Sequence, residues 1–147
     1  MTLNQYIERR NGVPLGASGA LRNMLHRSFG AGSFATFWRY WNPIFGYYLA
    51  KYVDSPLRRV LTRSIALILT FVICGALHDL AAMAVRGSVV FFCTMMFFFF
   101  AVGVLVGRWT GLSFSGLPWP ARAAINFTYL VACFALALAA RQVLAIP

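Results

Sequence analysis

The sequence predicts an all-α integral membrane protein with about three transmembrane helices, preceded by interfacial helices. Of its 147 residues, 61% are hydrophobic and 11% are charged, whereas soluble domains carry about 25% charged residues. Three apolar runs are each about 20 residues long, which is enough to cross a bilayer at a rise of about 1.5 Å per residue. Three such spans and an interfacial segment fill the chain, so we expect residues 1–147 to form a single membrane domain.

The positive charge of the chain indicates contact with lipid. Lys and Arg number 13 against three Asp and Glu, and nine of the 13 precede the first long apolar run. This distribution is typical of a flank that faces anionic lipid headgroups. A nucleic-acid surface would need exposed aromatic side chains beside the cations, whereas here the aromatic residues lie in apolar sequence. We therefore expect membrane lipids as partners and no nucleic acid.

The cations also predict an orientation in the membrane. If the three apolar runs span, then 11 of the 13 cations lie on the side of the N-terminus and the 108–122 loop, and two, Arg86 and Arg141, lie on the other side. Cytoplasmic loops carry the excess of Lys and Arg. We expect a multi-pass protein of a bacterial inner membrane with its N-terminus in the cytoplasm.

The segment before the spans is expected to lie at the membrane surface. Residues 1–32 look like an irregular basic surface segment, with a short basic helix around Leu21 to Phe29. Residues 33–63 are rich in aromatic side chains and predict short interfacial helices. Because a proline disfavours helical backbone in the preceding residue but suits the first turn of a helix, two of these helices should meet at Asn42 and Pro43.

Two further boundaries are expected in this segment. The helix that begins at Pro43 should run to about Val53 and lie in the interface, because it is too short to span the membrane. Ser55 should then cap a new helix with Pro56 in its first turn, and this helix should lead through basic residues into the first span.

The three predicted spans are Ser64 to Val85, Ser88 to Gly107 and Ala123 to Leu144. Only Arg86 and Gly87 separate the first two spans, which predicts a tight antiparallel hairpin. The loop before the third span contains Gly, Pro and two Trp residues, a composition that is typical of a segment at headgroup depth.

Two ionisable residues, His78 and Asp79, lie inside the first predicted span. Charged groups are costly there and usually face protein or a water-filled cavity. The small residues Cys74 and Gly75 lie within a helical turn of His78, so a close neighbouring helix or a substrate could occupy this face. From the residues alone, His78 fits either a site or a buried polar contact to a backbone carbonyl, and Asn42 fits either a site or a helix cap.

Two motifs resemble the membrane-bound O-acyltransferase (MBOAT) family. The stretch "SFATFWRYWNP" is followed by "TFVICGALHDL", with His78 placed 36 positions after Asn42. The interval and the acidic neighbour of the histidine resemble the sterol and diacylglycerol acyltransferase branch, whereas "SFATFWRYW" is similar to bacterial members. The resemblance covers Ser33 to roughly Val85, the segment that carries the catalytic motifs.

This resemblance implies a membrane-embedded O-acyltransferase, or its catalytic part, that moves an acyl group from a thioester to a hydroxyl acceptor. His78 would be the general base, and Asn42 would position the reacting groups in the same cavity. Asp79 would support the site by orienting His78 or a neighbouring helix. We expect an acyl thioester such as acyl-CoA as co-substrate, with no metal or other cofactor. The residues expected to contact the substrate are Trp38, Arg39 and Trp41.

A second hypothesis stays open, namely a non-enzymatic structural subunit derived from the same family. Enzymes of this family have more spans around a tunnel, so this chain is expected to associate with itself or with other membrane subunits. The two hypotheses differ in what they require. An enzyme needs Asn42 and His78 open to one cavity, whereas a structural subunit needs only that both side chains have partners.

Overall fold

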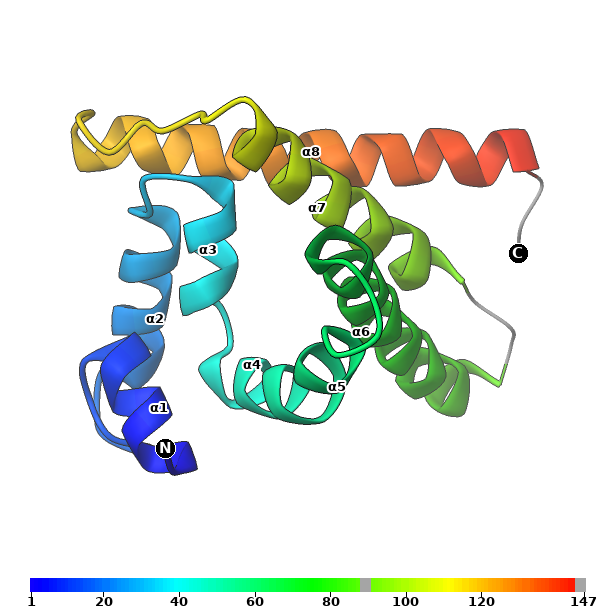
Figure 1. Cartoon of the computed structure of the whole chain (residues 1–147). Coiled ribbons are helices and arrows are strands. Elements are labelled where there is room, and N and C mark those ends of the chain that lie inside the picture. Colours follow the sequence, from blue (N-terminus) through cyan, green and yellow to red (C-terminus); the bar gives the residue numbers. More distant parts are fainter. Residues whose placement is uncertain (88–90, 145–147) are drawn as a thin grey trace.

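The computed structural model describes residues 1–87 and 91–144, which form helices joined by short loops, with no strand within these ranges (Figure 1). Most of the described backbone is therefore hydrogen-bonded within helices, as a lipid environment requires of the segments that cross it. The helices are α1 (Leu3–Asn11), α2 (Ala20–Phe29), α3 (Phe34–Tyr40), α4 (Pro43–Leu49), the π-helix η1 (Ala50–Asp54), α5 (Ser55–Leu57), α6 (Arg63–Arg86), α7 (Phe92–Trp109) and α8 (Trp119–Leu144).

The three long helices α6, α7 and α8 confirm the three predicted spans, since each is long and apolar enough to cross a membrane. α7 packs against α6 on one side and against α8 on the other (Figure 1). The predicted start of the second span, Ser88, lies outside the described residues. The helix itself runs from Phe92 to Trp109. α8 begins at Trp119 instead of Ala123, because Pro120 can occupy the first turn of a helix without loss of a hydrogen bond.

The expectation that residues 1–32 are irregular is wrong at the N-terminus. α1 begins with a capping box, in which Thr2 accepts a hydrogen bond from the Gln5 amide and the Gln5 side chain accepts one from the Thr2 amide. These contacts satisfy two backbone donors at the helix start. The expected basic helix around Leu21 to Phe29 is confirmed as α2.

The junction at Asn42 is confirmed, but the break expected at Ser55 is wrong. α4 begins at Pro43, and the helical backbone then continues through η1 and α5 as far as Leu57. In η1 the Ser55 amide donates to the Ala50 carbonyl, five residues back. This wider turn allows the chain to accommodate Pro56 without the steric break that a proline imposes on an α-helix. The break falls instead at residues 58–62, and Thr62 caps α6.

The core of the molecule forms around α3. Phe34 and Phe37 are 2% and 0% exposed and pack against apolar side chains of α7. The Phe34 ring also stacks on Tyr129 of α8, with the ring centroids 4.7 Å apart. α3 therefore lies against the long helices as part of the core, and one of its faces remains available to line a cavity.

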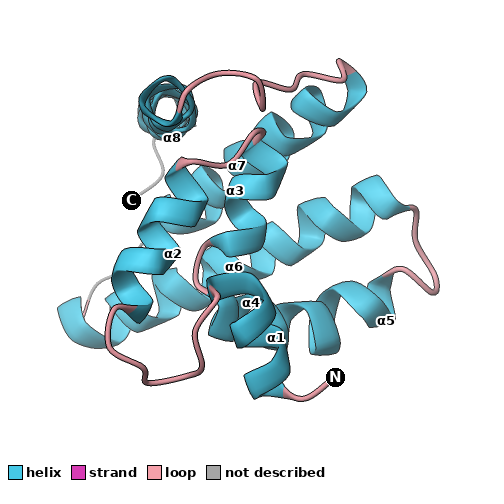
Figure 2. Ribbon diagram, turned by 90° about the vertical axis from the view of Figure 1, so that its left-hand side faces the viewer, coloured by secondary structure: helices cyan, strands magenta, loops and turns pink. Residues whose placement is uncertain are grey.

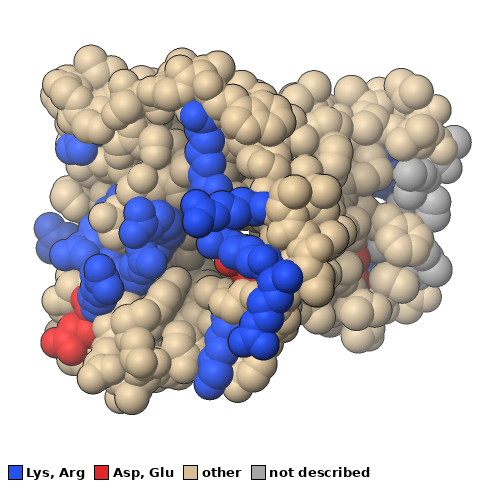
Figure 3. Space-filling model, in the orientation of Figure 1, with Lys and Arg blue, Asp and Glu red and all other residues tan. Residues whose placement is uncertain are grey.

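The N-terminal helices and the α7–α8 loop lie at the same end of the long helices, toward the left in Figure 1. This end faces the viewer in Figure 2, where α8 is seen along its axis. Asn126 of α8 is fully buried and donates to the carbonyls of Phe29 and Ala31, both at 2.9 Å. The Phe114 amide of the loop donates to the Gly32 carbonyl at 2.9 Å. Lys and Arg side chains are concentrated over this half of the face shown in Figure 3, and few appear over the other half.

Asp79 joins α6 to the N-terminus of α7. Its carboxylate is 2% exposed and accepts hydrogen bonds from the Cys93 amide at 2.8 Å, the Thr94 amide at 2.7 Å and the Thr94 hydroxyl at 2.6 Å. One turn earlier, a Cβ atom on Gly75 would lie 2.6 Å from the Cys93 carbonyl oxygen. The two helices therefore meet closely at Gly75, and Asp79 caps α7 from its neighbour.

We predict that Asp79→Ala lowers the free energy of unfolding by about 3 kcal/mol or more, because three buried donors lose their acceptor. Thr94→Val removes only one of these hydrogen bonds and should cost about 1 kcal/mol. Denaturant unfolding of the purified protein in detergent micelles would measure both. Equal and small losses in the two variants would contradict this role of Asp79.

Candidate active site

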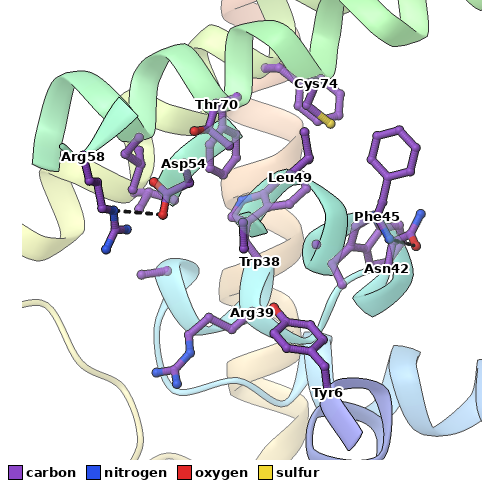
Figure 4. A pocket seen from close by; sticks show the side chains of 18 of the residues that line it. Tyr6, Trp38, Arg39, Asn42, Phe45, Leu49, Asp54, Arg58, Thr70 and Cys74 are labelled. Carbon is purple, nitrogen blue, oxygen red and sulfur yellow. Dashed lines mark hydrogen bonds and ion pairs between the residues drawn. The ribbon is translucent and has the colours of Figure 1, made fainter. Parts of the chain in front are cut away.

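A cavity of about 230 Å³ lies between α3, the continuous helical segment 43–57, α6 and α7 (Figure 4). We call it the main cavity. All of the candidate site residues except Asp79 line it, although they come from two segments of the chain that are far apart in sequence. These are Trp38, Arg39, Trp41, Asn42 and His78.

One face of α6 forms the long wall of the main cavity. Its lining residues recur at helical spacing of three or four positions, from Leu67 through Phe71 and Cys74 to His78. Eleven residues separate the first from the last, which corresponds to a rise of about 16 Å along the helix. The cavity is therefore an elongated groove with two chemically different ends.

His78 is held by its own helix and presents one free nitrogen. Its Nδ1 lies 2.7 Å from the Cys74 carbonyl oxygen, and because a carbonyl only accepts, Nδ1 carries the proton in the neutral ring. Nε2 is then unprotonated and has no hydrogen-bond partner among the described residues. The ring stacks on Phe97 at 5.1 Å and meets the edge of Phe45 at 5.8 Å. This tautomer is suited to accepting a proton at Nε2.

The side-chain amide of Asn42 has a structural role that uses only its oxygen atom. Its Oδ1 accepts a hydrogen bond from the Phe45 amide at 3.2 Å and so caps α4. Its backbone has φ 40°, a left-handed conformation that Asn tolerates better than most residues. The Nδ2 group donates no hydrogen bond within the described part of the chain, so the cap leaves a donor available to a bound molecule.

The aromatic wall is built by Trp38 on α3 and by Trp41, the residue that follows α3. The Trp38 ring meets the edge of Phe71 on α6 at 5.3 Å and lies 5.9 Å from Phe97 on α7. Trp41 stacks on Phe37 of the core at 5.4 Å. Phe97 thus lies between Trp38 and His78, and the aromatic surface continues from α3 to the histidine.

The other end of the main cavity is basic. Asp54 and Arg58 form an ion pair at 2.8 Å (Figure 4). Arg39 of α3 and Arg108 of α7 also line the cavity, and Arg108 interacts electrostatically with Asp54, Arg58 and Arg39. Three guanidinium groups and one carboxylate therefore line this end. Arg39 and Arg108 make no ion pair within the described residues, so this end is suited to an anionic group.

The sequence identified only part of this basic end. Arg108 was missed, because it reaches the cavity only through the antiparallel packing of α7 on α6. Lys51, about two turns before Arg58, lies outside the cavity with its ammonium over the rings of Tyr47 and Tyr52. A hydrogen bond to Tyr52 and the charge of Tyr47 raise the pKa of Lys51.

Asp79 does not line the main cavity, although it follows His78 directly. Successive residues on a helix point about 100° apart, and the Asp79 carboxylate is fully used by Cys93 and Thr94. It fixes the neighbouring helix and makes no contact with the imidazole. Within residues 1–87 and 91–144, no three His, Cys, Asp or Glu side chains gather closely enough to hold a metal ion.

Comparison with known proteins gives one match. A family model described as the membrane bound O-acyl transferase family matches residues 21–100, which is more than half of the chain. The matched residues run from α2 into α7 and include both Asn42 and His78. No curated protein and no solved structure matches the chain.

Proposed function

Because the chain belongs to the membrane bound O-acyl transferase family, we propose that it transfers an acyl group from a thioester to a hydroxyl acceptor in the main cavity. The observation that carries this proposal is that Asn42 and His78, 36 residues apart, line one cavity. Each also retains a polar atom without a hydrogen-bond partner among residues 1–87 and 91–144. A purely structural role would require neither feature.

In the proposed reaction His78 is the general base. The acceptor oxygen attacks the thioester carbonyl carbon while Nε2 of His78 takes the hydroxyl proton. The carbon–sulfur bond then breaks, and the departing thiolate takes the proton back from the imidazolium. An ester and a free thiol result, and the histidine returns to its neutral form without a covalent intermediate on the protein.

The free Nδ2 group of Asn42 is placed to support this step. As a hydrogen-bond donor it can hold the acceptor oxygen or the thioester carbonyl, where negative charge develops. The cap on α4 fixes the side chain in advance, because Oδ1 is held by the Phe45 amide. A donor fixed before the substrate binds need not be ordered during the reaction.

The basic end supports a thioester donor that carries an anionic group, such as acyl-CoA. Arg39 and Arg108 can contact phosphate oxygens there, and guanidinium groups bind phosphate in a forked geometry. Along α6 the cavity lining extends about 16 Å, from Leu67 to His78. We propose that the phosphate group of the donor binds at the arginines and its thioester lies near His78.

We predict that His78→Ala lowers acyl transfer about 100-fold or more, because the base that removes the acceptor proton is lost. Stability should change little, since the hydrogen bonds that the ring makes within the described residues both go to Cys74 of its own helix. His78→Gln should not restore activity.

The assay for His78 uses a labelled thioester with a panel of hydroxyl acceptors, with the amount of folded protein recorded. His26→Gln is the matched control, because His26 stacks on Trp119 outside the main cavity. If the wild type is inactive in its intact assembly, the structural-subunit hypothesis is favoured instead. Full activity of His78→Gln would contradict the role of His78 as general base.

We predict that Arg39→Gln and Arg108→Gln each raise the KM for the thioester donor about tenfold, because each removes a charge-assisted contact. The maximal rate should change less. Arg59→Gln is the control, since Arg59 is exposed and lies outside the main cavity. Equal effects of all three substitutions on KM would indicate a general effect of surface charge.

We also propose that the N-terminus and the 108–122 loop lie in the cytoplasm, because most of the cations are at that end. Single cysteines at Ser18 and Ser115 should then react with a membrane-impermeant thiol reagent only from the cytoplasmic side. A cysteine at Arg86 should react from the opposite side. Labelling of all three positions from one side would contradict the three-span topology.

A further inference from the structure

A second cavity lies next to the main cavity and has no part in the proposed reaction. It measures about 360 Å³ and lies between the start of α3, the end of α7, the loop 110–118 and α8. It shares Ala35 and Arg108 with the main cavity. The polar side chains that line it are Ser33, Thr36, Arg108, Ser113, Ser115 and Tyr129.

The hydroxyl groups of the second cavity can donate hydrogen bonds to a ligand. Ser33 and Thr36 pair at 2.9 Å, and Ser113 and Ser115 pair at 2.7 Å. One hydroxyl donates to the other within each pair, so each pair keeps one hydrogen for a bound molecule. The Tyr129 hydroxyl makes no hydrogen bond within the described residues and adds another donor.

The charge of the second cavity is positive. Arg108 makes no hydrogen bond or ion pair among the described residues, and no carboxylate lines this cavity. The full chain has only three acidic residues, and the one closest to Arg108, Asp54, is already paired with Arg58. A cation surrounded by hydroxyl donors without a carboxylate is suited to an anion that accepts several hydrogen bonds, such as phosphate.

The position of the second cavity indicates where such a phosphate would come from. The loop that lines it lies between Trp109 and Trp119, which are 72% and 38% exposed. Exposed Trp residues at the ends of transmembrane helices lie at the depth of the lipid headgroups. From this position and the donor set, we propose that the second cavity binds the phosphate group of a membrane phospholipid.

Phosphate binding in the second cavity would affect the main cavity through Arg108. The same guanidinium lines both cavities, so a phosphate held in the second cavity engages a charge that also faces the first. The binding itself depends on neither His78 nor acyl transfer. It can therefore be tested independently of the proposed function.

The test measures binding of phosphatidylglycerol to the purified full chain by native mass spectrometry in a phosphate-free detergent. We expect Arg108→Gln to weaken binding about tenfold or more, since a charge-assisted contact is lost. The double variant Ser113→Ala/Ser115→Ala should also weaken it, and it keeps the proposal testable if Arg108→Gln does not fold. Arg59→Gln and Ser18→Ala are controls outside both cavities and should bind like the wild type.

Further probes identify the source of the phosphate. A phosphate-free glucosyl diacylglycerol should bind equally weakly to the wild type and to Arg108→Gln. Glycerol phosphate should displace phosphatidylglycerol only at much higher concentration, because it lacks the acyl chains. The proposal is overturned if Arg59→Gln weakens lipid binding as much as Arg108→Gln, or if the glucosyl lipid binds as tightly as phosphatidylglycerol. It is also overturned if inorganic phosphate occupies the site as tightly as the lipid.

Discussion

The hydrogen bonds that Asp79 makes to the first turn of α7 determine how the two central helices meet. A buried carboxylate is stable only when its oxygens have strong partners, and here two amides and a hydroxyl provide them. Gly75 allows the close approach that these hydrogen bonds require. The same contact places Phe97, one turn after Thr94, against His78. The wall of the main cavity therefore depends on an interaction outside the cavity.

The side chains of Asn42 and His78 are held in the same way, although Asn42 caps a short helix and His78 lies inside a long one. Each side chain uses one polar atom to bind the backbone, and its other polar atom has no partner in the part of the chain that the structure describes. Oδ1 of Asn42 caps α4 and Nδ1 of His78 binds the carbonyl of Cys74. The cap that the sequence predicts for Asn42 is thus compatible with a role in the cavity. The structural and functional interpretations of this residue concern different atoms of the same amide.

The sequence predicted those features that depend on local chemistry. The long apolar runs predicted the spans, and the Asn-Pro step predicted the start of α4. The capping box at Thr2 and Gln5 was also present in the sequence, and the absence of a long apolar run there led to the wrong expectation of irregular backbone. Ser55 and Pro56 look like a helix start, but a π-helical turn carries the chain past them. Such a turn depends on tertiary packing more than on local residue preference.

The features that the sequence could not predict depend on contacts between distant segments. Arg108 joins the basic end because α7 returns antiparallel along α6, and nothing around Arg108 indicates Asp54 as its neighbour. The second cavity exists only because the α7–α8 loop folds onto Gly32. The role of Asp79 was only partly foreseen, since its partners Cys93 and Thr94 lie in the next helix. Proximity of this kind follows from the packing of helices and leaves no local pattern in the sequence.

The central claim is that Asn42 and His78 act on one substrate in one cavity, and a double-mutant cycle of acyl-transfer rates tests it most directly. Asn42→Gly suits this cycle, because glycine tolerates the left-handed backbone at φ 40° while losing the side chain. It is combined with His78→Ala at matched amounts of folded protein. If the two groups act as a unit, the double variant should be no slower than the slower single variant. If the two losses multiply as for independent sites, the claim of a shared site is contradicted.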